Sequence, residues 1–213
     1  MTEPLANNRR QLTLRVVLFT AFWMVGATIA RGVGLWKGIG GMALLLGTVA
    51  LVLYHKDLKV RLKPTRPALL TAGAAALLML AATYLLYPVV SLHIPYIARE
   101  TSTLYTDFGH ASVVELLLLF AIVICEEIVW RGIIQGSIET RLAPVPAVLL
   151  CGALYAAAHA PAGSPLLVLL ALVCGIFWSA LRAYSGSLLP ALIAHMVWDA
   201  AVFQLAPLVT AHR

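Results

Sequence analysis

Long apolar stretches with almost no charged residues dominate this sequence. Of its 213 residues, 62% are hydrophobic and only 11% are Asp, Glu, Lys or Arg. A soluble domain carries about 25% charged residues, so a chain with this composition cannot cover a surface that faces water. Lipid is the alternative solvent, and there a helix satisfies all of its own backbone hydrogen bonds. The sequence therefore predicts an all-α membrane protein.

A helix needs roughly 20 apolar residues to cross a bilayer. Seven segments of the sequence are apolar enough and meet this length or come close to it. They lie at about 14–33, 38–54, 68–90, 111–139, 144–160, 165–184 and 187–209. The second is short, and the fourth is long and interrupted by charged residues. We expect a polytopic transmembrane helical bundle of about seven spans, folded as one membrane domain over 1–213. Three spans and a loop occupy 1–110, and the last four spans occupy 111–209.

The basic residues set the expected orientation, because cytoplasmic loops of membrane proteins are enriched in Lys and Arg. With the N-terminus inside, one side holds Arg9, Arg10, Arg15, Lys56, Lys59, Arg61, Lys63, Arg66, Arg141 and Arg182. The other side holds only Arg31, Lys37, Arg99 and Arg213. This bias predicts a cytoplasmic N-terminus and a C-terminus outside. It also explains the +6 net charge. We therefore expect no binding of nucleic acid.

Ionisable residues inside apolar spans are costly, and they mark functional sites by default. The fourth span contains the pattern EExxxR, formed by Glu126, Glu127 and Arg131. Glu127 and Arg131 are four residues apart, so they share a helix face and can form an ion pair. Glu126 is rotated by about 100° from Glu127 and can face a different cavity, where a desolvated carboxylate suits proton transfer.

Two more polar pairs follow on later spans, each with members four residues apart and thus on one helix face. The first is Tyr155 with His159, and the second is His195 with Asp199. Asp199 can orient His195, or the two can act together on a metal ion or an oxyanion.

Helix lengths place these residues at similar depth in the bilayer. Glu126 and His159 lie on either side of the turn at 140–146, and each rises roughly 24 Å from it at 1.5 Å per residue. His195 and Asp199 lie roughly 13 and 19 Å from a second turn on the same side of the membrane. We therefore expect the three motifs to converge on one layer.

Three motifs occur in order on successive membrane helices: EExxxR, an aromatic residue four positions before a histidine, and HxxxD. This arrangement resembles the CAAX protease and bacteriocin-processing family of intramembrane endopeptidases. The resemblance covers roughly residues 111–205. Phenylalanine is common where this chain has Tyr155, and asparagine is common where it has Asp199. An ionised aspartate cannot donate the hydrogen bond that asparagine can.

The resemblance implies an intramembrane protease whose catalytic core lies in the last four spans. It implies that Glu126 activates water for attack on a peptide bond and that His159 assists. His195 and Asp199 then bind a metal or stabilise the oxyanion, while Glu127, Arg131 and Tyr155 act as support.

Two versions of this chemistry are open. Two histidines and a carboxylate, here His159, His195 and Asp199, can form a catalytic zinc site. The HExxH helix of zinc proteases is absent, however, and Glu126 with His159 can activate water without a metal. We favour the version without a cofactor.

Other classes of protein remain as alternatives. A proton or metal transporter would use the same buried charges, although transporters often show repeats in both halves and here only the second half is charged. A non-catalytic membrane protein with an immunity or scaffold role is another alternative. An integral-membrane lipid phosphatase would need an arginine where this chain has Leu189.

The expected location is a bacterial inner (plasma) membrane, crossed several times. The expected partners are the lipid bilayer and a membrane protein or peptide as substrate, such as a C-terminal tail or sorting segment. The loop at 93–110 is a candidate gate on one side of the site.

Overall fold

A computed structural model of the chain describes residues 3–106 and 112–209. Within these residues there are helices, short turns and no β-strand, which confirms the expected all-α fold. The α-helices are α1 (Glu3–Val33), α2 (Gly41–Arg61), α3 (Arg66–His93), α4 (Pro95–Thr106), α5 (Val113–Glu127), α6 (Gln135–Ile138), α7 (Pro144–His159), α8 (Pro165–Ser185) and α9 (Leu189–Asp199). Wider π-helical turns at Trp36–Gly40, Ile128–Ile134 and Ala200–Leu205, and a 3₁₀ turn at Ala160–Ala162, continue or join them.

Local sequence signals explain where several helices begin and end. Thr65, Ser112 and Ser164 each accept a hydrogen bond from the backbone N–H three residues later, at 3.3, 3.1 and 3.3 Å. Such side chains satisfy amide groups that the first turn of a helix leaves free. Gly186 ends α8 with a φ of 64°, a left-handed conformation that glycine adopts without steric cost.

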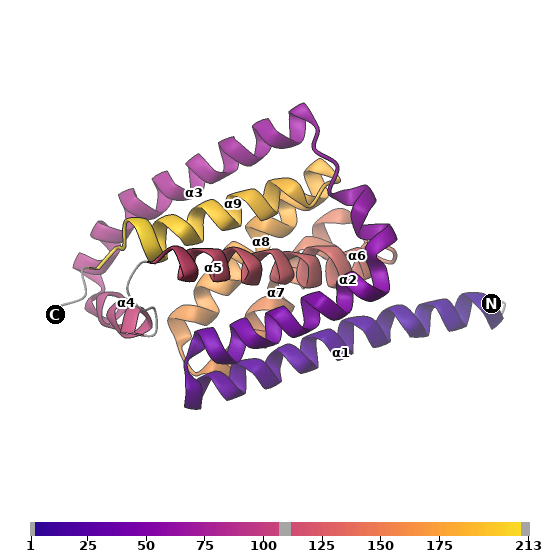
Figure 1. Ribbon diagram of the computed structural model, residues 1–213, viewed down its shortest axis with the longest axis horizontal. Coiled ribbons are helices and arrows are strands. Elements are labelled where there is room, and N and C mark those ends of the chain that lie inside the picture. The colour runs from indigo at the N-terminus through magenta and orange to yellow at the C-terminus, as the bar shows by residue number, and fades with distance from the viewer. Residues whose placement is uncertain (1–2, 107–111, 210–213) are drawn as a thin grey trace.

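Helix α5 lies near the middle of the bundle in Figure 1, with α3 and α9 on one side and α1 and α2 on the other. Helices α7 and α8 pack against each other, and α2 packs against α5. Two glycines permit this close packing. A Cβ on Gly47 would lie 2.3 Å from the Cβ of Cys125, and one on Gly152 would lie 3.0 Å from the backbone N of Ile176.

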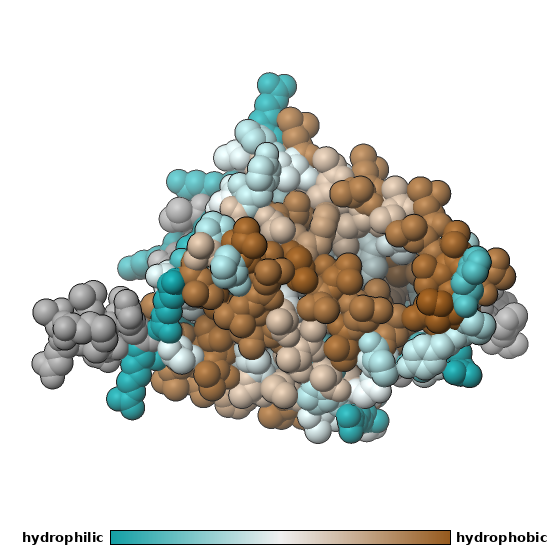
Figure 2. All heavy atoms as spheres, turned by 180° about the vertical axis from the view of Figure 1, so that it is seen from behind, coloured by the Kyte–Doolittle hydropathy of each residue, from teal (hydrophilic) through white to brown (hydrophobic). Residues whose placement is uncertain are grey.

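The surface and the helix lengths agree with a polytopic membrane protein. On the face in Figure 2, hydrophobic residues cover most of the middle, and hydrophilic ones gather toward the margins. Five described helical segments are long and apolar enough to cross a membrane: Arg10–Val33, Trp36–Lys56, Arg66–His93, Pro144–Ala162 and Pro165–Ser185. Leu189–Leu205 is a shorter apolar helix. The expected total of seven spans stays a prediction.

The fourth expected span is the central one, and its charges are turned inward. The helix continues from Val113 through the π-helical turn to Ile138. Glu126, Glu127 and Arg131 are 7%, 1% and 0% exposed, so the bundle rather than lipid surrounds them.

The segment 93–110 differs from the loop that we expected. His93 ends α3, and residues 95–106 form α4, while 107–110 lie outside the described residues. The hydroxyl of Tyr105 donates a hydrogen bond to the carbonyl oxygen of Val202 at 2.5 Å and accepts one from the amide of Leu208 at 3.1 Å. Burial raises the pKa of Tyr105 to about 12. Helix α4 is therefore anchored to the end of the last helix.

Candidate active site

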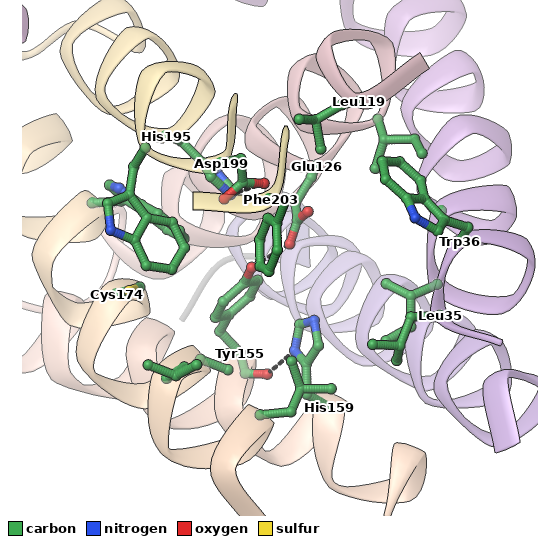
Figure 3. Close-up of a pocket in the computed structure, with 18 residues that line it drawn as sticks. Leu35, Trp36, Leu119, Glu126, Tyr155, His159, Cys174, His195, Asp199 and Phe203 are labelled. Carbon is green, nitrogen blue, oxygen red and sulfur yellow. Dashed lines mark hydrogen bonds and ion pairs between the residues drawn. The ribbon is translucent and has the colours of Figure 1, made fainter. Parts of the chain in front are cut away.

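A cavity of about 140 Å³ lies among the helices and has room for several water molecules. Figure 3 shows its polar side chains pointing inward from three helices: Glu126 from α5, Tyr155 and His159 from α7, and His195 and Asp199 from α9. Its other walls are mainly apolar. They are formed by Leu35, Trp36, Ile39, Gly40, Leu119, Ile122, Leu167, Leu170, Ala171, Cys174, Trp178, Trp198 and Phe203.

The two adjacent glutamates of the EExxxR motif point in different directions. Glu126 lines the cavity, and its Oε1 accepts a hydrogen bond from the hydroxyl of Tyr155. Glu127 does not line the cavity and instead faces Arg131. The rotation of about 100° between successive helical residues produces this division, as expected from the sequence.

Arg131 is fully buried. Of its three guanidinium nitrogen atoms, only Nε has no hydrogen-bond partner among the described residues. Its Nη1 lies 3.2 Å from Oε1 of Glu127, so the expected ion pair is present, and its Nη2 donates to the carbonyl oxygen of Gly175 at 3.2 Å. The guanidinium carbon lies 4.7 Å from the ring centre of Tyr155 and 5.2 Å from that of Trp178. Cation–π contacts of this kind are strongest where the charge is shielded from water.

His195 lies between two carboxylates. Its Nδ1 is 2.8 Å from Oε1 of Glu127, and its Nε2 is 3.4 Å from Oδ2 of Asp199. The imidazole ring stacks on Trp178, with the ring centres 3.6 Å apart and the planes inclined by 19°. The sequence pairs His195 with Asp199 alone, but the closer partner is Glu127. With an acceptor at each nitrogen, the ring is set up to donate from both.

His159 is held by its own helix and by α1. Its Nδ1 lies 2.7 Å from the carbonyl oxygen of Tyr155, which can only accept, so Nδ1 carries the hydrogen. The indole N–H of Trp23 donates to Nε2 at 3.3 Å. His159 thus has one defined tautomer, with a basic nitrogen at Nε2.

The donor set does not fit a zinc ion. As the side chains are placed, Nδ1 of His159 carries a hydrogen, and the other three ring nitrogens contact Trp23, Glu127 and Asp199, whereas each histidine ligand must turn a free lone pair toward the metal. In the part of the chain that the structure describes, no three His, Cys, Asp or Glu side chains are grouped to hold a metal ion.

The structure brings the four residues expected to carry the chemistry, Glu126, His159, His195 and Asp199, around one cavity. Their catalytic roles stay a prediction. Sequence reasoning missed Trp23, which contacts His159 from 136 positions away, and Trp178, which stacks on His195. Each of the two is a tryptophan inside an apolar span. That position could have indicated a polar contact, because a buried indole N–H usually needs an acceptor.

Fold and site together thus define a class: a polytopic helical membrane protein with a buried site of carboxylates and histidines. Residues 109–201 match the family described as type II CAAX prenyl endopeptidase, Rce1-like. The match contains the EExxxR, YxxxH and HxxxD motifs, and it supports a relationship of this segment to the CAAX protease family. At the family level these are intramembrane endopeptidases that act on membrane-associated substrates. Comparison with curated proteins and with solved structures found no significant match.

Replacing Arg131 by Met is expected to lower the free energy of unfolding by about 3–5 kcal/mol, because it removes the guanidinium partner of the buried Glu127 carboxylate. Thermal unfolding of the purified protein in detergent measures this loss. The matched control is Arg66→Met, an exposed arginine at the start of α3, for which a change within about 0.5 kcal/mol is expected. An Arg131→Met protein as stable as the control would show that the buried ion pair does not hold the site.

Proposed function

We propose that the chain is an intramembrane endopeptidase that hydrolyses a peptide bond of a membrane-associated protein or peptide. The observation that carries this proposal is the cavity where the Glu126 carboxylate meets His159, His195 and Asp199 at membrane depth. The Glu126 carboxylate is 7% exposed and faces a cavity with room for several water molecules. This is the position that a general base acting on water requires. The match of residues 109–201 to the type II CAAX prenyl endopeptidase family supports the reaction class.

In the proposed mechanism, Glu126 removes a proton from a water molecule as its oxygen attacks the carbonyl carbon of the scissile peptide bond. Nε2 of His159 has a single lone pair, so it exchanges the hydrogen bond from Trp23 for one from this water and fixes the orientation of the water. The C–N bond of the tetrahedral intermediate then breaks, and the proton held by Glu126 passes to the leaving amine. The products are a carboxylic acid and an amine, so atoms and charges balance.

His195 and Asp199 are assigned to the oxyanion. A ring that donates from both nitrogens can turn its Nε2–H from Asp199 toward the developing negative charge on the carbonyl oxygen. A preorganised donor in a site without bulk water stabilises such a charge strongly. The ionised Asp199 cannot itself donate a hydrogen bond, so we assign it the role of holding His195 in place.

Tyr155 is assigned a positioning role for Glu126. Its hydroxyl donates to Oε1 of the glutamate, while its ring is packed against Arg131 and against Trp130, whose ring centre lies 4.9 Å away. One carboxylate oxygen is thereby fixed, and the other is available to water. A phenylalanine, common at this position in the family, would lack this contact.

We assign access to the site from outside the cytoplasm, on the basis of the expected orientation and the lining of the cavity. The cavity walls include Leu35, Trp36 and Leu167, which lie near the connections 34–40 and 160–164 at one end of the bundle. With a cytoplasmic N-terminus, α1 delivers this end to the outer side. The proposed substrate is then an extracytoplasmic segment of a membrane protein or peptide, such as a C-terminal tail or sorting segment, with apolar side chains beside the cleaved bond.

Replacing Glu126 by Gln is expected to reduce peptide hydrolysis by at least roughly 100-fold, because the amide cannot take the proton from water. Quantitative comparison of membrane-protein termini in cells that carry the wild-type or the variant chain measures the change and identifies substrates.

The matched control is Glu115→Gln, which changes a glutamate in the first turn of the same helix, away from the cavity. A Glu126→Gln chain that yields wild-type termini would exclude Glu126 as the base. Metal analysis of the same active preparation should find zinc below one equivalent, and full occupancy would instead favour the metal version.

Replacing Tyr155 by Phe is expected to leave an active enzyme with kcat reduced by roughly 5-fold, the value of about 1 kcal/mol for one hydrogen bond. KM should not change, because the hydroxyl contacts Glu126 rather than the substrate. Steady-state kinetics on a substrate found by the termini comparison measures both. Tyr184→Phe, which alters a tyrosine that is 85% exposed, is the control. An unchanged kcat would remove Tyr155 from the mechanism.

Alkaline phosphatase, which is active only outside the cytoplasm, is expected to be active when fused after Leu208 and inactive when fused after Lys63. The physical reason is the basic 55–67 segment, which is retained on the cytoplasmic side. Enzyme assays on intact cells of a bacterial host read the result. The reverse pattern would place the cavity on the cytoplasmic side and discard the extracytoplasmic substrate.

A further inference from the structure

A second cavity, of about 500 Å³, lies at the opposite end of the bundle from the one that contains Glu126. Helices α1 and α2, the helix through the π-helical turn Ile128–Ile134 and α6, and the glycine that follows α8 form its walls. The two cavities share no lining residue. The lining consists of Leu12, Arg15, Tyr54, Leu58, Arg61, Gly132, Ile133, Gly136, Ser137, Thr140 and Gly186.

The charge of this lining is positive. Arg15 and Arg61 contribute guanidinium groups, and no Asp or Glu is among the described residues that line the cavity. The guanidinium carbon of Arg15 lies 4.6 Å from the ring centre of Tyr54, which is a cation–π contact. A guanidinium carries five N–H donors in a rigid fork that matches the oxygen atoms of a phosphate or carboxylate.

A third arginine, Arg182, lies next to Gly136 of the cavity lining. Arg182 is 2% exposed, and its Nη1 pairs with the carboxylate of Glu139. Its Nε and Nη2 are buried without a hydrogen-bond partner in the described part of the chain. A Cβ on Gly136, which lines the cavity, would lie 3.6 Å from that Nη2. Buried donors of this kind are nearly always satisfied in folded proteins. The two N–H groups of Arg182 beside the cavity are therefore placed to donate to an acceptor inside it.

The segment that follows α8 holds the backbone of Arg61 in place. The carbonyl oxygen of Arg61 accepts hydrogen bonds from the amide of Leu188 and the hydroxyl of Ser187, both at 3.0 Å. Arg61 is also close enough to Arg182 for their charges to repel. Positive groups that are fixed near one another at a helix-bundle end are stabilised by a bound anion, which lowers this repulsion.

The remaining lining indicates what kind of anion fits. Ser137 and Thr140 add hydroxyl groups on the polar side, while Leu12, Leu58 and Ile133 form an apolar wall. A phosphate group accepts several hydrogen bonds at once and pairs with planar guanidinium groups. The apolar wall suits the acyl chains next to such a group, and basic cavities between membrane helices on the cytoplasmic side recognise anionic lipids.

We propose that this cavity, lined by Arg15 and Arg61 and backed by Arg182, binds the phosphate group of an anionic phospholipid. The proposal concerns a site separate from the protease cavity, so either can fail without the other. The lipid joins α1 to α2 and to the central helix, and it therefore stabilises the fold.

The test is thermal unfolding of the full-length protein in detergent micelles during titration with dioleoylphosphatidylglycerol. The anionic lipid should raise the midpoint of the wild type, and zwitterionic dioleoylphosphatidylcholine should not. In the Arg15→Gln, Arg61→Gln double variant the apparent Kd should rise by roughly 10-fold or more, since hydrogen bonds to a charged group are lost. Arg66→Gln, an exposed arginine outside the cavity, is the matched control and should behave like the wild type.

If the double variant does not fold, Gly136→Val fills the cavity from its wall without removing a charge, and it should weaken the effect of the lipid to a similar degree. Inorganic phosphate that reproduces the shift at equal phosphate concentration would support the phosphate site with free phosphate as its source. Equal stabilisation by both lipids, or an undiminished effect of the anionic lipid on the cavity variants, would overturn the proposal.

Discussion

The buried guanidinium of Arg131 is the constraint on which the site depends. A cation at membrane depth must be paired, and here its neighbours are Glu127, the carbonyl oxygen of Gly175 and the rings of Tyr155 and Trp178. Three of these neighbours in turn hold the proposed catalytic groups. Glu127 contacts His195, Trp178 stacks on His195, and Tyr155 binds Glu126. The arginine needs no contact with substrate to set the geometry of the cavity.

The same helices separate two kinds of polar site at opposite ends of the bundle. The Glu126 cavity contains carboxylates, histidines and apolar walls, whereas the Arg15 cavity contains arginines and hydroxyl groups. In the proposed orientation the basic end faces the anionic cytoplasmic leaflet, which attracts Lys and Arg. The distribution of basic residues that orients the chain would thus also supply a lipid site.

Spacing alone predicts part of this site. The i to i+4 pairs and the two turns place Glu126, His159, His195 and Asp199 at similar depth, and the structure has all four around one cavity. Helix geometry makes such inferences dependable, because rise and rotation per residue are nearly constant. Contacts between helices are different. That His195 lies nearer to Glu127 than to Asp199, and that Trp23 reaches His159, depends on how helices rotate and pack, which periodicity does not encode.

The half of the chain without ionisable motifs contributes more to the site than its composition indicates. The family match covers 109–201 and contains every residue proposed to take part in the chemistry. Yet Trp23 of α1 holds the basic nitrogen of His159, and Leu35, Trp36 and Ile39 form a wall of the cavity. Under the proposed function, the second half supplies the chemistry, and the first half adds part of the wall that the substrate meets. A chain can then keep the EExxxR helix and its partners while changes in the first two spans alter which side chains fit beside the cleaved bond.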